Sequence, residues 1–169
     1  MIEKGDNTPK WIQKQKREKA EEKRQADEIT QRQLDAAMLI QQKGPDFWQQ
    51  LVNRLEANVT ALPELEDEEL AGSVSPSAPS GGELSCFIEV DRRSVEFGPE
   101  LSHMSLLYKS GGSRIRRWYQ DREMNDIELV TYHNEVRAVI DGSAPMTAED
   151  LGDQIVEWMA ERVKAKRSL

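Results

Sequence analysis

Apolar and polar residues alternate through the second half of the chain, from Leu84 to Ile140. The stretch LSCFIEV places Leu84, Cys86, Ile88 and Val90 on one side, and HMSLLYK, SRIRRWYQ, NDIELVTYH and EVRAVI continue the pattern. A period of two is typical of a β-strand with one buried face. The segments between these stretches are too short to connect parallel strands, so neighbouring strands must be antiparallel. The residues SVEF are read as a further short strand. This part of the chain therefore predicts an antiparallel β-meander of five or six strands.

The chain closes with a strongly amphipathic helical pattern, MTAEDLGDQIVEWMAERVKAK. Thr147 is a good N-cap, because Asp150 follows three residues later as in a capping box. The stripe expected to face a core consists of Leu151, Ile155, Trp158, Met159 and Val163. A helix of this kind must cover one face of the sheet, so residues 84–169 are predicted to form a two-layer α+β domain.

Residues 1–62 are predicted to form two helices. From Gln13 to Glu28 no large apolar residue occurs, which is typical of a helix surrounded by solvent. Helix-forming residues dominate, so a coiled coil is an alternative, but no heptad seam is sustained. Gly44 and Pro45 are expected to end this helix and to start the next one.

The second predicted helix has one wide apolar face. Its large side chains recur about every four residues, at Phe47, Trp48, Leu51, Leu55 and Val59. A single helix cannot bury such a face alone, so it must dock on the first helix, on the C-terminal domain or on another subunit. These five residues are the candidate partner-binding or self-association site.

Between the two parts lies an acidic stretch that is rich in Ser, Pro and Gly. Residues 44–83 hold one basic and eight acidic residues, and residues 63–83 contain few that could join a core. Such a composition cannot offset the entropy lost on ordering. Residues 63–83 are therefore predicted to be a flexible linker.

The stretch KSGGSRIRRW holds a glycine pair followed by three arginines and a tryptophan. Gly111 and Gly112 suit a two-residue hairpin loop. That loop sets Tyr108 opposite Ile115 and Leu106 opposite Arg117, on the apolar face. Arg117 would then pair with a carboxylate such as Glu157, or extend to the edge of the sheet, unless the register differs.

The following hairpins extend this register. A three-residue loop, Asp121 to Glu123, would set Arg116 opposite Glu128, and the last hairpin would turn at His133 and Asn134. Because side chains alternate between the two faces of a strand, this register places four residues on the polar face: Lys109, Arg114, Arg116 and Trp118. These four residues are the candidate site for an anionic ligand or polyanion, with Trp118 stacking. The alternative is an ordinary solvated face of mixed charge.

The sequence gives little sign of catalysis. SGGSRI lacks the lysine of a phosphate-binding loop, and a strand rather than a helix follows it. Cys86 is expected to pack in the core, His133 to lie in a turn and His103 to lie on the surface. We therefore predict no catalytic residue, no metal ligand and no cofactor. A small metal-dependent enzyme is the least favoured alternative.

The net charge of −8 argues against general nucleic-acid binding. A single cysteine fits a reducing compartment, and MIEKGDNTPKWIQKQ resembles no secretory signal, so we expect a cytoplasmic protein without a membrane span. The favoured hypothesis is a non-catalytic interaction or adaptor protein that associates through its amphipathic helices. The alternative is a domain that binds a small anionic ligand or polyanion on the basic face.

Overall fold

A computed structural model provides the structure of the chain. It describes residues 7–66, 68–78, 81–93 and 100–167, and the structural statements below concern those residues. The chain divides into two compact units, residues 1–37 and 38–169.

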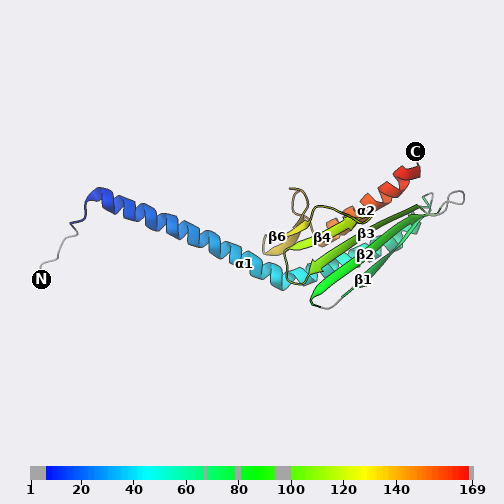
Figure 1. The fold of residues 1–169 in the computed structure, drawn as a ribbon, viewed down its shortest axis with the longest axis horizontal. Coiled ribbons are helices and arrows are strands. Elements are labelled where there is room, and N and C mark those ends of the chain that lie inside the picture. The colour runs from blue at the N-terminus through cyan, green and yellow to red at the C-terminus, as the bar shows by residue number, and fades with distance from the viewer. Residues whose placement is uncertain (1–6, 67, 79–80, 94–99, 168–169) are drawn as a thin grey trace. The chain divides into compact units, whose positions relative to one another are not determined.

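The elements follow the order expected for an α+β chain, with helices at both ends of a run of strands (Figure 1). Their bounds are α1 (Lys10–Ala61), the 3-10 turn η1 (Leu62–Glu64), β1 (Leu70–Ser77), β2 (Glu83–Arg92), β3 (Glu100–Lys109), β4 (Arg114–Tyr119), β5 (Arg122–Glu123), β6 (Ile127–Tyr132), β7 (Glu135–Val139) and α2 (Ala148–Arg167).

The N-terminal helical segment is one helix, so the prediction of two helices separated at Gly44 and Pro45 is wrong. A proline inside a helix costs about 3 kcal/mol or more, because its ring crowds the preceding turn and its N–H is missing. The helix continues because Phe47, Trp48 and Leu51 after the proline are buried in the core. Each such side chain contributes about 1.5–3 kcal/mol on burial, which together exceeds the cost of the proline.

Gly44 has a packing role inside the helix. A Cβ at this position would overlap the hydroxyl oxygen of Tyr108, which is fully buried in β3. The aromatic ring of Tyr108 also stacks on Trp48, with 5.6 Å between the ring centroids. Gly44 therefore lets α1 approach the sheet closely, and it does not end the helix.

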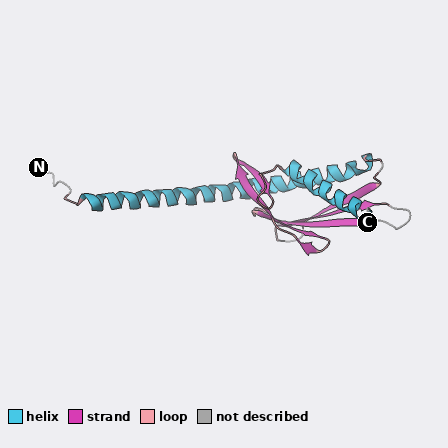
Figure 2. Cartoon of the chain, turned by 90° about the horizontal axis from the view of Figure 1, so that it is seen from above, coloured by secondary structure: helices cyan, strands magenta, loops and turns pink. Residues whose placement is uncertain are grey.

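The sheet is antiparallel and curled, in the strand order β1-β2-β3-β4-β6-β7, with β5 paired to β4. This arrangement confirms the predicted α+β class and the antiparallel meander. Figure 2 shows α2 and the C-terminal part of α1 on one side of the sheet, where the buried side chains form a single cluster. The segment SVEF, predicted as a short strand, lies outside the described residues.

A strand occupies part of the predicted linker. β1 pairs with β2 along its whole length, from Leu70 opposite Arg92 to Ser77 opposite Ser85. The prediction of a linker over 63–83 is therefore wrong for residues 70–77. The stretch is polar because β1 lies at the end of the strand order, where few side chains need burial and a proline is tolerated.

Two of the three predicted hairpin registers are confirmed. Tyr108 lies opposite Ile115, Leu106 opposite Arg117, and β6 pairs with β7 as expected. The middle register is wrong by two residues, because Glu128 lies opposite Arg114 and not opposite Arg116.

The shift has two parts. Gln120 and Asp121 adopt positive φ values of 49° and 63° and make a two-residue turn, so that Tyr119 lies opposite Arg122 and Trp118 opposite Glu123 in β5. The pairing then changes by one position between β5 and β6, where Ile115 lies opposite Ile127. A shift of two residues preserves parity, so the predicted faces of β4 and β6 remain correct.

Helix α2 begins as predicted, since the backbone N–H of Asp150 donates to Thr147 Oγ1 at 3.1 Å. It packs closely on α1 at Gly152. A Cβ there would lie 2.8 Å from Arg54 Cγ and 3.6 Å from the backbone nitrogen of Leu55. The two helices therefore form one layer over the apolar face of the sheet.

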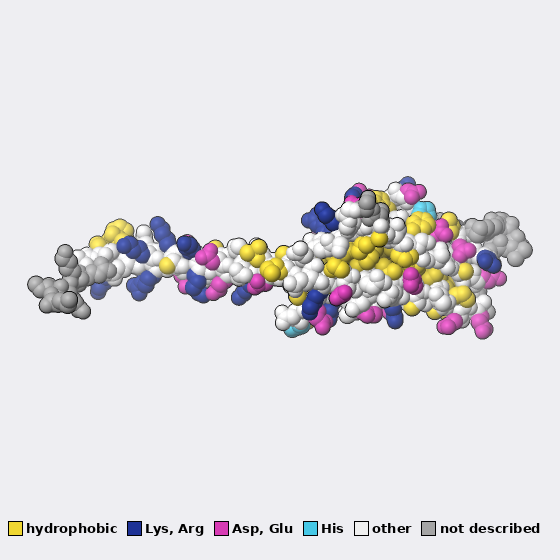
Figure 3. Space-filling model, turned by 90° about the horizontal axis from the view of Figure 1, so that it is seen from below, with side chains coloured by type: hydrophobic (Ala, Val, Ile, Leu, Met, Phe, Trp, Pro, Cys, Tyr) yellow, Lys and Arg dark blue, Asp and Glu magenta, His cyan; other side chains and the backbone are white. Residues whose placement is uncertain are grey.

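In the first unit, the described part of α1 is a largely exposed charged helix, as predicted. Arg24 forms ion pairs with Glu21 and with Glu28, one turn away on either side. Figure 3 shows mainly basic side chains toward the N-terminal end of this segment and both basic and acidic side chains farther along it. Three large apolar side chains of the described part of this unit, Trp11, Ile29 and Leu34, are more than half exposed.

Candidate functional site

The five candidate partner-binding residues are buried inside the second unit. Phe47, Trp48, Leu51, Leu55 and Val59 are each 5 % exposed or less. Of the three docking alternatives that the sequence left open, the structure shows the C-terminal domain of the same chain. This apolar face is therefore filled by the sheet and α2, and no part of it is a surface.

The four candidate anion-binding residues share the outer face of the sheet, as predicted, but they do not converge on one site. Arg116 donates from Nη2 to Glu123 Oε1 at 3.0 Å. Its guanidinium also lies 4.8 Å from the centroid of the Trp118 ring. Both Arg116 and Trp118 thus already have partners.

The other two basic residues also have acidic neighbours. Lys109 lies opposite Glu83 in the β2–β3 pairing, and Arg114 lies opposite Glu128 in the β4–β6 pairing. Opposite charges across a strand pair attract each other, so each cation is at least partly compensated. The outer face therefore agrees with the alternative stated from the sequence, an ordinary solvated face of mixed charge.

The residues considered for catalysis do not form a reactive group. Burial raises the pKa of Cys86 to about 12, which leaves it a neutral thiol. His103 lies 3.5 Å from a carboxylate oxygen of Asp121, and His133 lies in the turn after β6. Within the described ranges, no group of three or more His, Cys, Asp or Glu side chains is arranged to hold a metal ion.

The residue that sequence parity left unexplained, Arg117, is the distinctive feature of the second unit. It points to the core side of β4 and is 8 % exposed. Neither predicted arrangement, an ion pair with Glu157 or an extension to the sheet edge, is found. Instead, Arg117 Nε donates to the backbone oxygen of Asn125 at 2.7 Å.

The guanidinium of Arg117 forms no ion pair with the described residues. None of their carboxylate oxygens lies within 4.0 Å of one of its nitrogen atoms. Burial lowers the pKa of Arg117, while the charges of Asp141 and Asp126 act in the opposite direction. An arginine stays protonated in a protein despite such a shift. The structure therefore holds a buried positive charge whose compensation is incomplete.

A pocket of about 230 Å³ opens beside this charge. We call it the Arg117 pocket, and its lining is Met104, Arg117, Met124, Ile140, Asp141, Gln154, Ile155 and Trp158. Among the described residues, the side-chain atoms sealed from solvent without a hydrogen bond are Arg92 Nε and Glu100 Oε2. The Nη1 and Nη2 atoms of Arg117 are not among them, so both atoms, which have no hydrogen bond to the described residues, retain some exposure to solvent.

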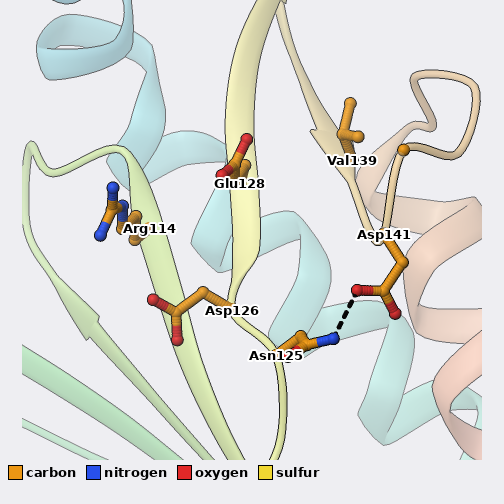
Figure 4. Close-up of a pocket in the computed structure, with 7 residues that line it drawn as sticks. Arg114, Asn125, Asp126, Glu128, Val139 and Asp141 are labelled. Carbon is orange, nitrogen blue, oxygen red and sulfur yellow. Dashed lines mark hydrogen bonds between the residues drawn. The ribbon is translucent and has the colours of Figure 1, made fainter.

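A second hollow, of about 360 Å³, adjoins the Arg117 pocket and shares Asp141 with it (Figure 4). Asn125 stands between the two, because its Nδ2 donates to Asp141 Oδ1 at 2.7 Å while its backbone oxygen accepts from Arg117. Arg114, Asp126 and Glu128 all line this outer hollow (Figure 4). This outer hollow is mainly acidic and is a poor place for an anion.

The indole of Trp158 forms a wall of the Arg117 pocket and is held by two neighbours. The guanidinium of Arg162 lies 3.8 Å from the ring centroid, and the Tyr119 ring meets Trp158 edge-on at 4.6 Å. The remaining apolar walls come from methionine and isoleucine side chains. The arrangement resembles small-molecule sites in general, which are mostly apolar with a few convergent polar groups.

Comparison with known proteins gives no match to a family model, to a curated protein or to a solved structure. Neither helix of the described residues combines the length and apolar character that crossing a membrane requires.

Proposed function

We propose that this chain is a non-catalytic binding protein whose second unit holds a small organic anion in the Arg117 pocket. The observation that carries the proposal is the buried guanidinium, which faces a pocket with apolar walls and has no carboxylate in ion-pair contact among the described residues. A largely buried charge without an ion-pair partner is less well stabilised than the same charge in water. A bound anion would supply the missing compensation.

This proposal keeps the anionic-ligand hypothesis and moves it to another residue. On the outer face, Arg116 already binds Glu123, so an anion there would have to displace a carboxylate. At Arg117 the only hydrogen bond to the described residues is the one to the carbonyl of Asn125, which leaves the Nη groups for a ligand. Binding is proposed and not catalysis, because the lining of the pocket pairs no nucleophile with a base.

The test is isothermal titration calorimetry with benzoate and with benzenesulfonate. The chain offers a matched pair of variants, Arg117→Met and Arg116→Met, at adjacent positions on opposite faces of β4. At least one probe should bind the wild type and Arg116→Met equally, and Arg117→Met at least about tenfold more weakly, which corresponds to about 1.4 kcal/mol. Binding that is absent throughout, or equal in all three proteins, contradicts the proposal.

The interaction function remains a second candidate, on a different surface. Trp11 and Ile29 are both exposed and lie 18 residues apart, which is five helical turns, so they share one face of α1. Residues 10–19 hold five basic residues and one acidic residue, a net of +4, and residues 21–30 hold two and four, a net of −2.

In an antiparallel pair of copies, these segments would lie side by side with opposite charges, and Trp11 of one copy would meet Ile29 of the other. We therefore propose self-association through this face. Sedimentation equilibrium should show a dimer that dissociates when Ile29→Lys is introduced, while Thr30→Lys, at an exposed site outside the face, has little effect. A wild-type chain that stays monomeric at high concentration contradicts this candidate.

A further inference from the structure

The shape and charge of the Arg117 pocket restrict the ligand further, if the proposed function holds. We infer that the ligand is a monocarboxylate with a compact apolar body, about ten non-hydrogen atoms in all. Three features of the pocket carry this inference, namely its volume, its charges and its walls.

The volume limits the size of the ligand. Drug-sized molecules occupy pockets of about 300–1,000 Å³, and this pocket measures about 230 Å³. A water molecule takes up about 30 Å³ in the liquid, so the space corresponds to about eight waters. A nucleotide or a long-chain lipid does not fit, and a free acid of medium length does.

The charges define the head group and limit it to one negative charge. The planar fork of a guanidinium matches a carboxylate, which can accept two parallel hydrogen bonds. Asp141 lines the same pocket, and its charge together with that of Asp126 already acts on Arg117. A second negative charge on the ligand would be repelled by these two carboxylates.

The walls select the apolar body. Met104 and Met124 supply flexible thioether side chains that adapt to irregular shapes. Trp158 offers a rigid surface, because Arg162 and Tyr119 fix its ring. An apolar body gains from leaving water here, while a polar one would lose hydrogen bonds that these side chains cannot replace.

The experiment compares four probes of matched chemistry by calorimetry. Octanoate has the inferred size and charge, suberate adds a second carboxylate at the far end, 1-octanol removes the charge, and acetate removes the apolar body. Octanoate should bind the wild type at least about tenfold more tightly than each of the others, and Arg117→Met should remove its advantage over 1-octanol.

A second variant tests the pocket without touching the charge. Gln154 lines the pocket from an exposed position on α2, so Gln154→Trp should fold and place a ring over the opening. It should weaken octanoate binding at least about tenfold, while Arg116→Met leaves it unchanged. Circular dichroism melts confirm that each variant is folded.

The outcomes separate the two levels of the proposal. If suberate binds as tightly as octanoate and still requires Arg117, the inferred ligand class is wrong and the proposed function stands. If inorganic phosphate is the only probe whose binding requires Arg117, the pocket holds no organic anion and both are wrong. If binding of every probe, phosphate included, is independent of Arg117, both are wrong.

Discussion

The close contact of α1 with β3 at Gly44 leads to a quantitative prediction for Gly44→Ala. In a helix interior, this substitution normally stabilises by about 1 kcal/mol, because glycine is a poor helix former. Here the new methyl group would overlap the hydroxyl oxygen of Tyr108. That oxygen is held in place, since it accepts a hydrogen bond from the backbone N–H of Gly111 at 3.2 Å and its ring stacks on Trp48.

Overpacking of this kind costs about 1–3 kcal/mol. Because the overlapping atom cannot move away, we expect a cost near the upper end of that range. Subtracting the gain in helix propensity leaves a net loss of about 2 kcal/mol in the free energy of unfolding. Gly44→Ala should therefore destabilise the chain, against the usual direction.

Tyr108→Phe provides the control, because it removes only the overlapping oxygen. The next ring atom, Cζ, would lie 3.4 Å from the new Cβ, which is an ordinary contact. In this background Gly44→Ala should become neutral or stabilising by up to about 1 kcal/mol, which gives a coupling of about 2–3 kcal/mol. Tyr108→Phe alone should cost about 1 kcal/mol through the lost hydrogen bond.

Urea unfolding of the wild type, both single variants and the double variant, followed by far-UV circular dichroism, measures all four free energies. The reasoning is refuted if Gly44→Ala stabilises the wild-type chain. It is equally refuted if the effect of Gly44→Ala is the same with tyrosine and with phenylalanine at position 108.

Three further predictions follow from the burial and pairing of individual side chains. Burial raises the pKa of Cys86 to about 12, so at neutral pH a dithionitrobenzoate assay should label it on the order of a thousandfold more slowly in the native chain than in urea; equal rates would contradict its burial. Hydrogen bonds from Arg54 hold the pKa of Asp153 below its usual range, so the stabilisation is present above the unfolded pKa near 4 and is lost as the pH falls through the lower folded pKa. Asp153→Asn should therefore lower the thermal midpoint more at pH 7 than at pH 2, and an equal effect at both would rule out the ion pair as the cause. The double variant Arg114→Ala and Arg116→Ala should bind to a heparin column as the wild type does, because both cations have acidic neighbours. Elution of the double variant at a lower salt concentration than the wild type would instead support an anion-binding site on the outer face.

The sequence predicts the second unit well wherever parity decides the structure. Alternation assigns the faces of β2, β3, β4, β6 and β7, and it places Arg117 among apolar positions although an arginine is unexpected there. The two-residue shift of β6 escapes prediction, because it depends on positive φ values at Gln120 and Asp121, which are not glycines, and on a one-position change of pairing between β5 and β6. Parity tolerates that error and would not tolerate a shift of one residue.

The two wrong element predictions have a common physical cause. Gly44 and Pro45 are helix breakers by local propensity, and Ser73 to Ser77 are linker-like by composition, yet tertiary contacts override both. The helix is maintained by the buried side chains that follow it, and β1 by its full pairing with β2. A local rule cannot anticipate contacts between residues so far apart in the chain.

The candidate site is only half visible in the sequence. Arg117 stands out by parity alone, but the pocket also needs Gln154, Ile155 and Trp158 from α2, together with Asp141 from the turn after β7. Their meeting depends on how α2 lies across the sheet, which no spacing in the sequence encodes. The basic residues of the outer face attract more attention in the sequence, although strand pairing for Lys109 and Arg114 and a side-chain hydrogen bond for Arg116 give each of them an acidic neighbour.

A crystal structure of the full chain grown with excess octanoate tests the central claim most directly. The account predicts the carboxylate within about 2.7–3.2 Å of Arg117 Nη1 or Nη2, the normal range for such a hydrogen bond. The carbon chain should lie against Trp158 and the two methionines of the pocket. Octanoate bound elsewhere on the chain, or a pocket that holds only water at a saturating concentration, would contradict it.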